Sequence, residues 1–107
     1  MNLSVSDRVL LGNLLSAYKG SFANLKVIRE GRESLSFSDE ELTDLNFVEA
    51  NGQVQWNLKA SEKYQSVDIE FSNTVIEIIR NELLKLNDQS QLTMQYFSLY
   101  ETFVRAG

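Results

Sequence analysis

The hydrophobic pattern changes period twice along the chain, and this limits the folds that the sequence can form. On either side of a central segment, apolar residues recur every three or four positions, as on one face of an α-helix. Within residues 54–58 and 67–71, apolar and polar residues alternate, which is typical of a half-buried β-strand. The sequence therefore predicts an α+β fold, with helices on both sides of a small sheet.

Two helices are predicted in the N-terminal third. Ser4 or Ser6 can cap the first, which runs from about Ser6 to Tyr18 and places Leu10, Leu11, Leu14, Leu15 and Tyr18 on one stripe. Ser21 caps the second, which extends to about Ser34. Its apolar side is expected to carry Phe22, Leu25, Ile28 and Leu35, with Arg32 on the same side.

The segment from Ser38 to Glu41 is predicted to form a capping box. The serine hydroxyl would accept a hydrogen bond from the Glu41 amide, and the Glu41 carboxylate would accept one from the serine amide. This box opens a short helix from Asp39 to Leu45, with Leu42 and Leu45 facing inward.

A small antiparallel sheet is expected in the middle of the chain. Asn51-Gly52 tolerates the positive φ angles of a tight hairpin turn. Two or three strands are predicted around residues 46–49, 53–58 and 66–71. Their inner face would carry Val54, Trp56, Leu58, Val67, Ile69 and Phe71.

Two further helices follow the sheet. Ser72 or Asn73 caps a helix to about Leu86, with Leu84 pointing away from a shared face of Val75, Ile76, Ile79, Leu83 and Leu86. Thr93 caps the last helix, which carries a stripe of Tyr96, Phe97, Tyr100, Phe103 and Val104. The prediction is thus about five helices with the sheet between the third and fourth. With 107 residues, they form a single domain spanning 1–107.

Residue types that carry common chemistry are missing. The chain has no histidine and no cysteine, which removes the commonest general base, the thiolate nucleophile and the usual metal ligands. It contains no nucleophile elbow, P-loop or dinucleotide-binding turn. The densest carboxylates, from Asp39 to Asp44, lack the spacing of a calcium loop and suit a helix N-terminus. We therefore expect a protein that is not an enzyme and that needs no cofactor or metal.

The charge is distributed unevenly. The net charge of −5 comes from ten basic and fifteen acidic residues, and residues 33–107 hold thirteen of those acids against five bases. This balance disfavours a protein that binds a phosphate backbone and suits a partner with a basic surface. The residues expected to contact such a partner are Glu33, Asp39, Glu40, Glu41, Asp44 and Glu49.

Arg32 is the basic residue that is predicted to lie on the apolar side of its helix, between Leu25 and Ile28. A guanidinium in such a place must be paired or must reach solvent along its own stem. A structural pair with a carboxylate of the acid-rich segment is the favoured interpretation, and contact with a partner is the alternative.

The expected location is the cytoplasm. No apolar run approaches the roughly 20 residues of a membrane span. The first residues lack the basic leader and small-residue cleavage site of a signal peptide.

Three helices followed by a hairpin could also form a winged helix-turn-helix. The third helix would then enter the major groove, but Asp39 to Leu45 offers four acids and no basic side chain. The row of Lys26, Arg29 and Arg32 could contact a DNA backbone, although such a row also suits a solvated helix rim. If the N-terminal part is winged-helix-like, we expect it to serve protein contact.

Two stretches and the C-terminal end are similar to segments of small proteins encoded by bacteriophages and prophages. These are Leu25 to Arg29, Leu35 to Leu42, and Leu92 to Val104. The resemblance implies a source in a mobile element and transfers no activity or functional residue. It favours a phage accessory factor that binds and modulates a host or phage protein. The alternatives are a DNA-binding protein and a virion or assembly component that self-associates, for example through Val9, Leu84 and Met94.

Overall fold

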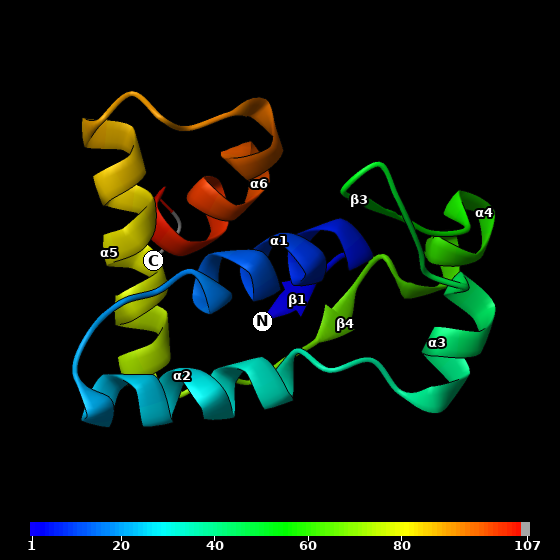
Figure 1. Ribbon diagram of the computed structural model, residues 1–107, viewed down its shortest axis with the longest axis horizontal. Coiled ribbons are helices and arrows are strands. Elements are labelled where there is room, and N and C mark those ends of the chain that lie inside the picture. Colours follow the sequence, from blue (N-terminus) through cyan, green and yellow to red (C-terminus); the bar gives the residue numbers. More distant parts are fainter. Residues whose placement is uncertain (106–107) are drawn as a thin grey trace.

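The computed structural model describes residues 1–105. Within them the chain is α+β, as the sequence predicts (Figure 1). These residues form six α-helices and two small two-stranded antiparallel sheets, where the prediction is about five helices and one sheet. The helices are α1 (Val5–Ser16), α2 (Phe22–Ser34), α3 (Asp39–Leu45), α4 (Leu58–Ser61), α5 (Asn73–Asp88) and α6 (Phe97–Tyr100). The strands are β1 (Asn2–Leu3), β2 (Val48–Ala50), β3 (Gln53–Gln55) and β4 (Val67–Asp68). Short 3-10 turns cover Glu62–Tyr64 and Met94–Tyr96, and a π-helical turn covers Glu101–Arg105.

Four serines begin the four longest helices. The hydroxyl of each accepts a hydrogen bond from the amide three residues later, over 3.1–3.3 Å, which satisfies a donor that the first turn leaves free. The serines are Ser4, Ser21, Ser38 and Ser72. The capping box at Ser38 is complete, because its amide donates to Glu41 Oε1 over 2.9 Å. These caps confirm the predicted starts of α2, α3 and α5.

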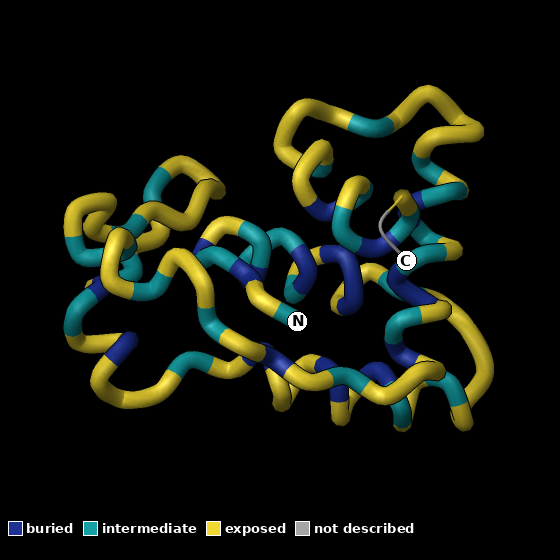
Figure 2. The backbone as a smooth tube through the Cα atoms, turned by 180° about the vertical axis from the view of Figure 1, so that it is seen from behind, coloured by how far each residue is buried: buried dark blue, intermediate teal, exposed yellow. Residues whose placement is uncertain are grey.

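The hydrophobic core lies where α1, α2, α5 and the C-terminal helical turns meet. Figure 2 shows most of the buried backbone in this region. The cluster consists of Leu3, Leu11, Leu14, Leu15, Ile28, Leu35, Ile69, Val75, Ile78, Ile79, Leu83, Leu99 and Phe103. The predicted inner faces of α1 and α5 contribute six of these thirteen residues, and Leu84 is half-buried.

The buried face of helix α2 is rotated from the predicted one: Ile28 and Leu35 are buried as predicted, but Phe22 and Leu25 are not. Phe22 is 82% exposed and Leu25 is also exposed, whereas Gly31 is buried. A Cβ atom on Gly31 would lie 3.0 Å from Cγ1 of Val75, so the two helices approach closely at a residue without a side chain. This rotation also corrects the prediction for Arg32, which is exposed on the outer side of the helix.

The predicted hairpin forms, but the third strand joins another sheet. Asn51 and Gly52 take positive φ angles of 54° and 76° between β2 and β3, as the turn requires. Strand β4 pairs instead with β1, and the Ile69 amide donates to the carbonyl of Met1 over 2.8 Å. This pairing is preferred because it carries Leu3 and Ile69 into the main core.

Other inward-facing predictions are wrong at exposed positions. Leu42 on α3 is exposed, as are Val54 and Leu58, because the segment after β3 turns into α4 and leaves the sheet. In the last helix Leu99 is buried and Phe97 is exposed, because the backbone passes from a 3-10 turn to an α and then a π turn. The Thr93 side chain makes no capping bond there.

Residues 38–66 form a lobe at one end of the molecule, hereafter the acidic lobe. It comprises α3, the β2–β3 hairpin, α4 and the following 3-10 turn, and Figure 1 shows it apart from α5. Helix α3 lies beside α4 and away from α2, whereas a helix-turn-helix keeps its two helices in contact across a short turn.

Filling the space at Gly31 should destabilise the core. Gly31→Leu would force α2 away from the buried Val75, and we expect the free energy of unfolding to fall by about 1–3 kcal/mol. Gly12→Ala is the control, because a Cβ atom at position 12 meets nothing within 4 Å. We expect this variant to raise the free energy of unfolding by about 0.5–1 kcal/mol. Urea unfolding followed by circular dichroism measures both, and an unchanged Gly31→Leu variant would contradict the close approach.

Candidate interaction surfaces

A buried ion pair fixes the acidic lobe to the main body. Arg8, on the second turn of α1, is 3% exposed, and its Nη1 donates to Glu41 Oε2 over 2.5 Å. Its Nη2 donates to the carbonyl of Ser36 over 2.7 Å. One guanidinium therefore holds both the first turn of α3 and the segment that leads into it.

Aromatic rings continue this connection into the hairpin. The guanidinium carbon of Arg8 lies 3.9 Å from the centre of the Phe37 ring, in a cation–π arrangement. The Phe37 ring centre lies 4.9 Å from that of Phe47, which lies 5.9 Å from that of Trp56. These tilted contacts are within the range of favourable aromatic pairs. The row links α1 to the start and the end of the hairpin.

Glu41 serves the fold, and this corrects its assignment to a partner-binding surface. Burial raises the pKa of Glu41, but hydrogen bonds from Arg8 and from the Ser38 amide outweigh this effect and bring the pKa below its usual range. The Glu41 carboxylate is buried against Arg8, so little of it can reach a partner protein.

Arg8 is the buried arginine that the sequence analysis missed. It shares the α1 stripe of Leu11 and Leu15 at spacings of three and seven residues, which is the signal that could have revealed it. The expected type of pair exists, between a buried arginine and the acid-rich segment, but Arg8 forms it instead of Arg32.

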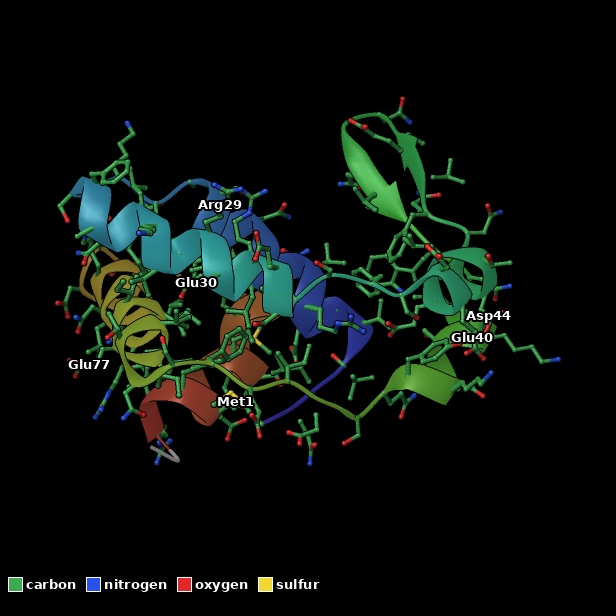
Figure 3. All side chains as sticks on the ribbon, turned by 90° about the horizontal axis from the view of Figure 1, so that it is seen from below. Met1, Arg29, Glu30, Glu40, Asp44 and Glu77 are labelled. Atoms are coloured by element: carbon green, nitrogen blue, oxygen red, sulfur yellow. The ribbon has the colours of Figure 1, made fainter. Side chains whose placement is uncertain are left out.

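Two of the acids on α3, the exposed Glu40 and the half-buried Asp44, share a lysine. Lys63 Nζ lies 3.1 Å from Glu40 Oε1 and 3.6 Å from Asp44 Oδ2. The Tyr64 hydroxyl donates to Asp44 over 2.5 Å, and this bond is the main reason why the pKa of Asp44 lies below its usual range. Figure 3 shows Glu40 and Asp44 together at the end of the lobe. Asp39, at the start of α3, is exposed beside them in sequence.

The other two predicted acids lie elsewhere. Glu33 is on α2, where it pairs with Arg29 over 3.6 Å at an exposed i,i+4 position. Glu49 is exposed on β2. The structure therefore groups Asp39, Glu40 and Asp44 on α3 and separates them from Glu33 and Glu49.

A cleft of about 610 Å³ lies between α1 and the hairpin. Its size falls within the roughly 300–1,000 Å³ of typical binding clefts. The helix wall consists of Ser6, Val9, Leu10 and Asn13, and the opposite wall of Glu49, Gly52, Gln53, Val54 and Trp56, with Gln95 between them.

A second, more apolar groove of about 380 Å³ lies at the C-terminal helical turns. Met94 and Phe97 are exposed in it, beside Leu92 and Tyr100. Val9 and Met94 therefore line different cavities, and Leu84 lines neither of the two.

The described residues contain no cluster of three or more carboxylates that could hold a metal ion. Among residues 1–105, no helix has both the length and the apolar character needed to cross a membrane.

No family model matches this chain, and neither does any curated protein or any solved structure. The function must therefore be inferred from the residues of the chain itself.

Breaking the buried ion pair should be costly, because one charge is then left buried without its partner. Glu41→Gln leaves Arg8 buried without its counter-charge, and we expect the free energy of unfolding to fall by about 3 kcal/mol. Glu40→Gln, at the adjacent exposed position, is the control and should leave it nearly unchanged. Urea unfolding measures both variants. Replacing both partners, with Arg8→Met and Glu41→Leu, should recover part of the loss, and failure of Glu41→Gln to destabilise would contradict the role of the pair.

The lowered pKa of Glu41 predicts that the stability of the fold decreases at low pH. Because the pKa of Glu41 is lower in the folded chain, its contribution is complete above the ordinary pKa of a glutamate and is lost as the pH falls through the folded value. We expect the stability difference between the natural chain and Glu41→Gln to narrow as the pH falls below about 5. Unfolding curves at stepped pH values test this, and a difference that stays constant would contradict it.

Proposed function

We propose that this protein is a small binding module without catalytic activity, an accessory factor of phage or prophage origin that binds and modulates another protein in the cytoplasm. The two carboxylates with shifted pKa values support this proposal. Both pKa values are lowered, whereas a general acid near neutral pH needs a raised one. Both groups are also engaged in hydrogen bonds that hold the lobe together.

The observation that carries the proposal is the surface of the acidic lobe. Residues 38–66 hold six acids and two lysines. Of these acids, Glu41 is paired with the buried Arg8. The same lobe exposes large apolar side chains, with Leu58 at 74% and with Leu42, Val48 and Val54 also exposed. Apolar residues rimmed by charge are a mark of protein contact. A partner with a basic surface and some apolar character fits such a face.

Self-association is the second candidate function, and the C-terminal groove favours it. Met94 is 81% exposed next to the exposed ring of Phe97, and a virion or assembly component could use this groove between copies. Light scattering across a range of concentrations tests this candidate, because assembly must then grow with concentration.

Charge reversal on α3 should abolish partner capture. The variant Asp39→Lys/Glu40→Lys changes two exposed acids and leaves Glu41 in place, so the lobe stays attached. In affinity isolation from expressing host cells, we expect the protein captured by the natural chain to be at least tenfold depleted, because like charges would then face each other.

The control is Glu30→Lys/Glu77→Lys, which makes the same change of charge at exposed sites. Figure 3 shows Glu30 on α2 and Glu77 on α5, away from Glu40 and Asp44. This control should capture the same protein as the natural chain. Equal capture by all three chains would overturn the acidic contact.

A further inference from the structure

The free edge of β3 offers an unused backbone donor and acceptor. Ala50 and Gln53 close the two-residue turn as a hydrogen-bonded pair, so Glu49 and Val54 are the next, non-hydrogen-bonded pair. The amide and carbonyl of Val54 therefore point away from β2. No backbone hydrogen bond to Val54 from outside the hairpin is found within the described part of the chain.

This edge borders the cleft between the hairpin and α1. Val54 and Trp56, which alternate along the strand direction, both line it, and Val9 and Leu10 of α1 lie on the opposite wall. Figure 1 shows the hairpin beside the N-terminal end of α1. An extended segment placed along β3 would thus be held between a strand edge and a helix.

Strand β3 is short, and its residues supply no charged side chain or proline to cover its edge. Natural proteins usually blunt exposed edges with lysine, other charges or proline, and Gln53-Val54-Gln55 has none of these. All three residues are exposed. Strand β2, by contrast, carries the charged Glu49 at its centre.

The charge of the cleft selects its occupant. Glu49 shares a sheet face with Val54, and among the described residues that line the cleft it is the one ionisable side chain. A second copy of this chain would bring another acidic lobe and a further net charge of −5 to the site. A segment with a basic side chain that reaches over Val54 toward Glu49 avoids that repulsion and gains an attraction.

We propose that the cleft binds an extended, basic segment of the partner protein, which adds as a third strand to the free edge of β3. The segment donates to the Val54 carbonyl and accepts from the Val54 amide, as in other cases of strand addition. Its Lys or Arg extends over Val54 toward Glu49 on the same sheet face, and its apolar side chains contact Leu10 and Trp56. This inference rests on the proposed function and names the partner's chemistry at one site.

The probe is a library of acetylated octapeptides in which Lys or Arg alternates with Val, Ile, Thr or Tyr. Binding to the full chain is measured by fluorescence anisotropy. Val54→Pro removes the outward amide without touching the ladder to β2, and proline is tolerated at such an edge position. Val54→Thr is the matched control, because it keeps the amide and the β-branched shape. We expect library members that bind the natural chain and Val54→Thr equally, and Val54→Pro at least tenfold more weakly.

A second measurement keeps the test decisive if Val54→Pro fails to fold. Amide hydrogen exchange of the natural chain with a selected peptide should slow at Val54. The inference is overturned if no library member binds, if Val54→Pro binds as the natural chain does, if protection appears on α3 instead, or if β3 pairs with a second copy. Should Asp39→Lys/Glu40→Lys lose its captured protein while Val54→Pro keeps it, the proposed function stands and the cleft inference fails.

Discussion

The ion pair between Arg8 and Glu41 is the constraint on which the placement of the acidic lobe depends. Glu41 accepts from Arg8 through one carboxylate oxygen and from the Ser38 amide through the other. The start of α3 and its attachment to α1 therefore share one side chain. A buried pair of this kind adds little net stability over apolar packing, but breaking it is costly, so it specifies one arrangement of the lobe. Among residues 1–105, no hydrogen-bond partner is found for the Nε atom of Arg8.

The two halves of the molecule are held by different physical forces. The main body is stabilised by a continuous apolar cluster, in which α1, α2, α5 and the C-terminal turns bury leucine, isoleucine and phenylalanine. Residues 38–66 bury a single apolar side chain, that of Leu45. The acidic lobe therefore relies on caps, the ion pair and the aromatic row. Such a lobe exposes more of its side chains, which suits a part of the molecule that meets a partner.

Local signals allowed the helix starts and the hairpin turn to be predicted from sequence. Serine caps and Asn51-Gly52 act through neighbouring backbone groups, so a short stretch of sequence contains the whole cause. The face of α2, the pairing of β4 with β1 and the burial of Arg8 depend on which elements meet in space. For α2 the deciding fact is the contact of Gly31 with Val75, 44 positions away, which no helical period contains. The acids were found from composition, but only the structure separates the structural Glu41 from Asp39 and Glu40 on the surface.

The position of Trp56 has a practical consequence. It is the single tryptophan of the chain, it ends the aromatic row that begins over Arg8, and its side chain lies on the wall of the cleft. Its intrinsic emission therefore comes from the place where the hairpin meets α1. Detachment of the lobe would expose the indole ring to water, whereas filling of the cleft would shield the same ring from water. The protein thus contains its own optical reporter for both events, with no added label.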